Sequence, residues 1–195
     1  MRLAGAIGLA ACIASLATAA PAAERFAIDP SHSNILFLVG HLGYSRMVGQ
    51  FQEFTGEFTF DEQAVEGSAV AVTISAASID TDDQARDDHL RSPDFFNAAE
   101  FPEITFVSTA IERTGDNTGR ITGELTLLGV TKPVTLDVTF NQKAPHPLPQ
   151  YNGVLVAGFS GRTKILRSDF GMSTFAPAIG DEIEILLEVE GQQAP

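Results

Sequence analysis

The chain has 195 residues, 44% of them hydrophobic, and a formal net charge of −13 from 12 basic and 25 acidic side chains. This length is enough for one substantial core, and the acidic excess argues against nucleic acid or an anionic bilayer as an electrostatic partner. The single cysteine, Cys12, lies near the N-terminus, so the rest of the chain can form neither a disulfide nor a thiolate site.

The N-terminal stretch has the features of a secretory leader. Arg2 is followed by an apolar segment and by small residues in the A-x-A pattern of a cleavage site, at Ala17–Ala19 or Ala20–Ala22. We therefore expect residues 1–20 to be a cleaved signal peptide and residues 21–195 to form one domain in the periplasm. Leu9–Cys12 also resembles a lipoprotein cleavage box, which leaves acylation of Cys12 as an alternative.

The remainder of the chain begins with three predicted strands. An apolar run over residues 34–39 ends at Gly40, and alternation of period two marks residues 54–60 and 70–76. Phe51 is out of step with the second of these strands, which indicates a bulge near Gln52 or Glu53. A bulge of this kind bends a strand and helps a sheet to close.

The segment of residues 80–100 breaks the strand pattern and is predicted to be a helical insert near one end of the sheet. Asp80–Asp83 would cap a helix, and Arg86 and Arg91 would pair with neighbouring acids. Ser92-Pro93 would begin a second helix, with serine as its cap. The apolar side of the insert carries several phenylalanines, so we expect it to cover the sheet as a lid.

Five further strands are predicted, over residues 104–106, 121–128, 134–140, 154–165 and 181–190. A hairpin turn is expected at residues 115–119 and a proline-rich loop at residues 144–150. An antiparallel sheet of eight strands with one apolar face must fold over or close on itself. We therefore predict an all-β fold, an eight-stranded antiparallel barrel, with a two-sheet sandwich as the alternative.

No hydrolase, nucleotide-binding or metal-binding motif occurs after the leader, so we predict no catalytic residue, metal or cofactor. Two groups leave an enzymatic alternative open. His41 is in phase with the apolar face of the first strand, and Asp87 with His89 could form a proton-transfer pair. The alternative function is an enzyme that acts on a lipid or quinone.

A basic cluster stands out against the acidic background. Arg162, Lys164 and Arg167 lie close together in the sequence and could receive an anionic head group. They could equally pair with Glu184 and Glu188 of the last strand.

Six motifs in the same order resemble those of the YceI-like family of polyisoprenoid-binding proteins. They are Asp29–Ser33, His41–Gly43 with Gly49–Gly56, Arg86–Ser92 with Asp94–Phe96, Phe101–Phe106, Gly123–Thr126 with Gly129–Val134, and Arg167–Met172. The resemblance implies a lipocalin-like barrel whose apolar pocket holds a long isoprenoid or similar lipid, in a periplasmic protein without an established catalytic activity. The family's pocket residues are varied apolar side chains, so the ligand candidates come from the alternation in this chain.

The predicted function is therefore binding, transport or storage of a long-chain isoprenoid or similar amphiphile, of the polyprenyl phosphate or quinone type, with a link to stress protection. The candidate ligand contacts are Ile35, Phe37, Val39, His41, Phe51, Phe54, Phe58, Val72, Ile74, Phe106, Phe159, Arg162, Arg167, Phe170 and Phe175. Roughly ten buried methylene equivalents at ~0.8 kcal/mol each would give micromolar affinity before the costs of association.

Two further points stay open. The 14 phenylalanines could instead fill the barrel completely, which would make the chain a structural or adhesive domain. We expect no nucleic acid partner and no stable membrane insertion, and homodimer formation is left open.

Overall fold

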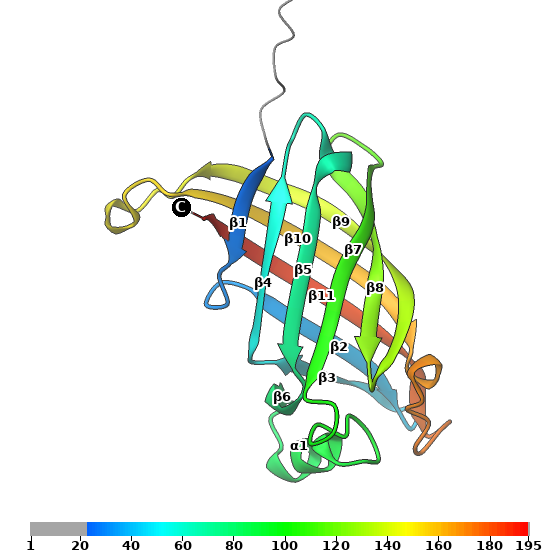
Figure 1. Ribbon diagram of the computed structural model, residues 1–195. Coiled ribbons are helices and arrows are strands. Elements are labelled where there is room, and N and C mark those ends of the chain that lie inside the picture. The colour runs from blue at the N-terminus through cyan, green and yellow to red at the C-terminus, as the bar shows by residue number, and fades with distance from the viewer. Residues whose placement is uncertain (1–22, 195) are drawn as a thin grey trace, which may run out of the picture.

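The computed structural model describes residues 23–194, and its strands form one antiparallel sheet that closes into a barrel (Figure 1). The strands are β1 (Glu24–Ile28), β2 (Asn34–His41), β3 (Ser45–Phe51), β4 (Phe54–Phe60), β5 (Ala69–Ser75), β6 (Ile79–Asp80), β7 (Glu103–Arg113), β8 (Thr118–Leu127), β9 (Val130–Pro145), β10 (Leu155–Leu166) and β11 (Ile179–Gln193). The helices are α1 (Gln84–Arg91) and the short 3₁₀ helices η1 (Val65–Gly67), η2 (Ala76–Ser78), η3 (Pro149–Tyr151) and η4 (Arg167–Phe170). The leader predicted for residues 1–20 lies outside the described residues.

The barrel closes because the last strand pairs with the first two. Along β11, Gln193 pairs with Phe26 of β1 and Leu186 pairs with Leu36 of β2. In the same way β3 pairs with β2, while β4 pairs with β1. The segments β1 and β2 act as one bent strand, and so do β3 and β4. With β5 and β7 to β11 the ring has eight strands, which confirms the predicted antiparallel barrel.

The bend between β3 and β4 lies where Phe51 is out of step. Phe51 and Phe54 are both buried, whereas Gln52 and Glu53 between them are exposed. The two phenylalanines therefore face the interior from either side of the break, as the predicted bulge required.

The sequence pattern missed β1, β3 and the two-residue strand β6. In β3 the inward position between Met47 and Phe51 is taken by Gly49, which removes an apolar residue from the alternation. The ring of Phe37 from β2 lies over Gly49 and fills the space instead. The predicted strand at residues 104–106 is the start of a much longer strand, β7.

A tight turn links β1 to β2 and is centred on Asp29. Its carboxylate accepts hydrogen bonds from Ser31 N at 2.9 Å, Ser31 Oγ at 2.6 Å, His32 Nδ1 at 2.9 Å and Gln192 Nε2 at 2.9 Å. Burial raises the pKa of Asp29, but these hydrogen bonds outweigh it and lower the pKa to about 2. The turn is thus fastened to the end of β11 by a carboxylate that stays ionised down to about pH 2.

The insert contains one helix, not two. Asp83 caps α1 by accepting a hydrogen bond from Arg86 N at 2.9 Å, as predicted. The second helix predicted at Ser92-Pro93 is wrong, since the chain makes a turn in which Phe95 N and Asn97 N both donate to Ser92 O. Asn97 adopts a φ of 42°, a left-handed conformation that a helix cannot continue through.

Two arginines of the insert have different partners. Arg91 pairs with Asp88 at 3.0 Å, as predicted. The pairing of Arg86 with an acid is wrong, because its guanidinium donates to Thr81 Oγ1 at 2.7 Å and Thr81 O at 2.6 Å. Arg91 also donates to Ala77 O at 2.7 Å and to Ile79 O at 2.8 Å, so both arginines fasten α1 to the segment that precedes it. Within residues 23–194, no helix is long and apolar enough to cross a membrane.

Candidate functional site

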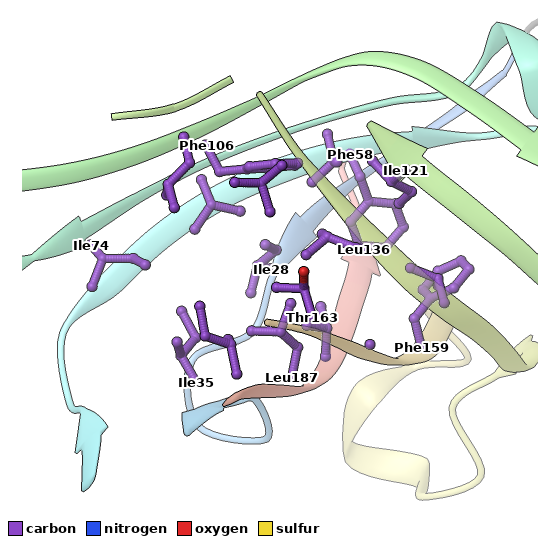
Figure 2. A pocket seen from close by; sticks show the side chains of 18 of the residues that line it. Ile28, Ile35, Phe58, Ile74, Phe106, Ile121, Leu136, Phe159, Thr163 and Leu187 are labelled. Atoms are coloured by element: carbon purple, nitrogen blue, oxygen red, sulfur yellow. The ribbon is translucent and has the colours of Figure 1, made fainter. Parts of the chain in front are cut away.

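The interior of the barrel holds a cavity of about 540 Å³. Every strand of the ring contributes apolar side chains to its wall, and Figure 2 shows Ile35, Phe58 and Leu136 among those pointing into the shared space. A volume of this size falls in the range of small-molecule pockets, and an apolar cavity stays dry and accepts apolar guests. The interior is therefore not filled by phenylalanine, which contradicts the structural-domain hypothesis.

Most of the predicted ligand contacts lie in this wall. Those that line the cavity are Ile35, Phe37, Val39, Phe51, Phe54, Phe58, Val72, Ile74, Phe106, Phe159 and Arg167. They come together because the period-two alternation places each of the strand residues on the concave face.

Four predicted contacts lie outside the lining. His41 is exposed at the end of β2, and Arg162 is exposed because it alternates with Gly161 and Thr163, which face the cavity. Phe170 is buried in η4, beyond the end of β10, where it packs into the core without lining the cavity. Phe175 is 55% exposed in the loop before β11. The structure thus gives these four predicted contacts no place in the cavity lining.

The wall also contains residues that were not singled out. Ile104, Ile121, Leu136, Val138 and Leu187 all line the cavity. Each lies on the apolar phase of a predicted strand, so the same alternation could have identified them. Thr163 is a polar residue in the wall, and its hydroxyl donates to Thr135 O at 2.8 Å. That hydroxyl is satisfied by the barrel itself.

One end of the cavity has an aromatic wall. The ring centroids of Phe60 and Phe159 are 5.1 Å apart with the rings at 89°, and those of Phe58 and Phe159 are 5.5 Å apart at 86°. Phe140 packs against both Phe60 and Phe159 at 5.1 Å and 5.4 Å. The two edge-to-face pairs of Phe159 add to the stability gained by burial, and the Phe140 pairs are tilted at 45°.

Inward-facing glycines fall into two kinds. The ring of Phe106 lies over Gly123 and that of Phe58 lies over Gly191, so an added Cβ would collide with each ring. Gly161 has no ring over it, and a Cβ there would meet only ordinary contacts, the nearest being Leu187 Cδ1 at 3.4 Å. Gly161 itself lines the cavity. Of these three glycines, only Gly161 has no phenylalanine ring over it, and the cavity lies beside it.

The insert and the loop after η4 close the other end of the cavity. Leu90, Phe95 and Phe96 from the insert line it, together with Met172 and Ile179 from the loop and the start of β11. Figure 1 shows the insert with α1 beneath this end of the barrel. The insert covers the barrel end, in agreement with the predicted position near one end.

Arg167 fixes that loop and is 2% exposed. Its guanidinium donates to Gly180 O at 2.9 Å, Met172 O at 3.1 Å, Thr174 O at 2.9 Å and Ile179 O at 3.1 Å. Burial away from water lowers the pKa of Arg167. These four hydrogen bonds direct the side chain toward the loop backbone and away from the predicted role with a ligand head group.

The other residues of the basic cluster and the acids predicted to pair with them also have separate partners. Lys164 pairs with Glu182 at 2.7 Å, and Arg46 of β3 takes Glu184. Glu188 accepts a hydrogen bond from Ser160 Oγ at 2.6 Å. The predicted pairing of the cluster with Glu184 and Glu188 is therefore wrong.

The groups behind the enzymatic alternative do not converge on the cavity. Asp87 is buried and accepts hydrogen bonds from Thr81 N at 2.9 Å and Thr81 Oγ1 at 2.6 Å. His89 Nε2 lies 3.0 Å from Asp94 Oδ2. Asp87 and His89 thus have separate partners, and neither lines the cavity. Among residues 23–194, no group of three or more histidine, cysteine and acidic side chains is arranged to hold a metal.

Comparison with known proteins extends over nearly the whole barrel. Residues 26–191 match the family described as the YceI-like domain. The protein YceI of Salmonella arizonae is 42% identical over 178 residues, which covers 90% of this chain and 91% of the relative. The crystal structure of BcnA from Burkholderia cenocepacia superposes with a TM-score of 0.75 at 29% identity, covering 84% of this chain and 98% of that one. A polyisoprenoid binding domain from Saccharophagus degradans has a TM-score of 0.66 at 12% identity, covering 87% of this chain and 98% of that domain.

Proposed function

Because the chain belongs to the YceI-like family, we propose that its barrel binds a long-chain isoprenoid or a similar amphiphilic lipid. The observation that carries the proposal is the largely apolar cavity of about 540 Å³ at the centre of the barrel. An apolar chain that enters it leaves water for a dry wall, and each buried methylene contributes ~0.8 kcal/mol. The domain from Saccharophagus degradans supports the architecture, and the cavity supports the ligand class.

The proposed contacts are the apolar side chains of the wall. They include the predicted Ile35, Phe37, Val39, Phe51, Phe54, Phe58, Val72, Ile74, Phe106 and Phe159, and the newly identified Ile104, Ile121, Leu136, Val138 and Leu187. A wall of varied aliphatic and aromatic groups recognises length and thickness of a chain more than any single atom. A carrier of this kind stores or transports its lipid without chemical change, which makes the protein a binding protein and not an enzyme.

The cellular role follows from the leader predicted for residues 1–20. A mature barrel in the periplasm would keep an insoluble lipid dispersed between membranes and shield it from oxidative or acid stress. Fractionation of cells that express the full chain tests this location. The barrel should be released with the periplasmic contents, and retention in the cytoplasm would contradict it.

The binding proposal is tested by extraction of the protein purified from its native host. Mass spectrometry of the organic phase should recover about one lipid per barrel, with an isoprenoid pattern of masses. A stripped sample should take up geranylgeraniol from detergent. If no stoichiometric lipid is recovered and the stripped protein takes up no prenyl probe, the proposal fails.

A further inference from the structure

The two ends of the cavity differ in polarity. At the end near α1 the lining is apolar apart from Arg167, whose guanidinium is bound to loop carbonyls. At the opposite end polar residues line the mouth, from the loop between β4 and β5 and from the turn between β7 and β8. Figure 1 shows these two connections side by side, at the end of the barrel away from α1. An amphiphile in the cavity would place its tail toward α1 and its head at this rim.

The rim carries more negative than positive charge. The charged residues of the rim that line the cavity are Glu62, Glu112 and Asp116 against Arg113. Arg113 is committed to the backbone, since it donates to Asp116 O at 3.0 Å and to Glu62 O at 2.5 Å. These bonds tie the two connections together. Arg113 keeps its charge and Glu112 lies 3.6 Å from Arg120, but three carboxylates against one guanidinium leave the cavity-facing rim net negative.

A lysine next to the rim is also engaged. Lys143 Nζ lies 2.6 Å from Glu24 Oε2 and 3.8 Å from Glu62 Oε2, and its side chain is only 18% exposed. The same ammonium lies over the ring of Phe60, 5.7 Å from its centroid. Phe60 and Phe140 line the cavity just inside the rim. One ring of this aromatic wall therefore already has a cation over its face, the geometry that a cation–π interaction favours.

We propose that the acidic rim selects amphiphiles whose head is uncharged or cationic and discriminates against phosphate heads. This inference rests on the proposed function and decides between the phosphate and quinone types that the sequence left open. An anionic head at the mouth would meet carboxylates, and the nearby cations are already engaged by carbonyls or acids. A hydroxyl or carbonyl head would meet hydrogen-bonding groups, and an ammonium head would gain attraction from the carboxylates and the rings.

The experiment compares three ligands with one tail. Geranylgeranylamine, geranylgeraniol and geranylgeranyl phosphate are titrated calorimetrically into the stripped protein at pH 7.5 and low salt. The amine is protonated at this pH, because alkylammonium groups titrate near pH 10. The phosphate should bind at least tenfold more weakly than the alcohol, and the amine at least as tightly as the alcohol. Raising the salt to 0.5 M should reduce the difference in affinity between the phosphate and the alcohol, since exposed charges are screened.

A charge reversal provides the matched test. The double variant Glu62→Lys with Asp116→Lys should bring the phosphate to or above the affinity of the alcohol. The control is Glu103→Lys with Glu124→Lys, which changes net charge equally at exposed positions outside the cavity lining and should keep the wild-type order. Circular dichroism checks that both variants are folded. If either is not, the order of the three ligand affinities in the wild-type protein still tests the proposal.

The outcomes separate the two proposals. Phosphate binding equal to or tighter than alcohol binding in the wild type would overturn the selection by the rim while lipid binding stands. Binding of none of the three ligands would overturn lipid binding itself. If the double variant Glu62→Lys with Asp116→Lys keeps the wild-type order of ligand affinities, selection of the head group by the rim would also be refuted.

Discussion

Replacement of Gly161 by leucine should block the cavity without harming the fold. Gly161 lies opposite Val138 on β9 and Leu187 on β11, and all three line the cavity. A Cβ at this position meets nothing closer than 3.4 Å, so the new side chain can point into the hollow. A leucine side chain has four carbons and would displace about four methylene groups of a guest. At ~0.8 kcal/mol each this costs ~3 kcal/mol, or a ~200-fold weaker Kd.

The assay is calorimetric titration with geranylgeraniol, together with thermal unfolding. The melting temperature should stay constant or rise, because glycine inside a strand costs ~0.5–1 kcal/mol relative to alanine. Arg162→Leu is the matched control, since it adds the same side chain at the next, outward-facing position of β10 and should leave the Kd within twofold. A Gly161→Leu barrel that binds the probe as tightly as wild type would refute the central cavity as the ligand site.

Three other predictions concern stability and the enzymatic alternative. Asp29→Asn should lower the free energy of unfolding at pH 7 by roughly 2 kcal/mol, because the folded pKa of about 2 lies below the unfolded value. That contribution is present above pH 4 and is lost as the pH falls toward 2, so urea unfolding should show a flatter acid limb in the variant than in wild type. Arg167→Met leaves buried carbonyls unpaired and should cost more than ~3 kcal/mol, seen as a melting temperature lower by roughly 10 °C; a shift of only a degree or two would show that the loop does not depend on this residue. His41→Ala and His89→Ala should keep the wild-type Kd for geranylgeraniol, and a tenfold loss in either would place that histidine in the site.

The predictable part of the fold is the part governed by binary patterning. In the last strand every second residue from Ile183 to Val189 is apolar, with acids between them except at Leu186, and β11 is found there with that apolar set facing the cavity. Strand β3 was missed because Gly49 occupies an inward position and its space is filled by a ring from another strand. A pattern in one segment cannot reveal a side chain that is supplied by its neighbour.

Alternation predicted which side chains face the interior of the barrel, but not how far along the barrel axis each one lies. His41 is in phase with inward-facing residues, yet it lies at the strand end, beyond the lining. Phe170 follows the end of β10, where alternation no longer reports on the cavity. Arg167 could not be assigned from its neighbours in sequence, because two of its acceptors, Ile179 O and Gly180 O, belong to the start of β11, 12 and 13 residues further along the chain. Long-range backbone contacts of this kind leave no mark in a local motif.

The pairing of β1 with β11 has a consequence for how the protein is made. Phe26 meets Gln193 across the seam, so the ring closes only when the two ends of the described chain come together. Contacts between residues so distant in sequence impose a large loop-closure entropy, and all-β chains of this kind fold in milliseconds to seconds. During synthesis, the edge of β1 that pairs with β11 stays unpaired until β11 has been made. The hollow comes into being at that final step, so a guest can be enclosed only by a chain that is already complete through β11.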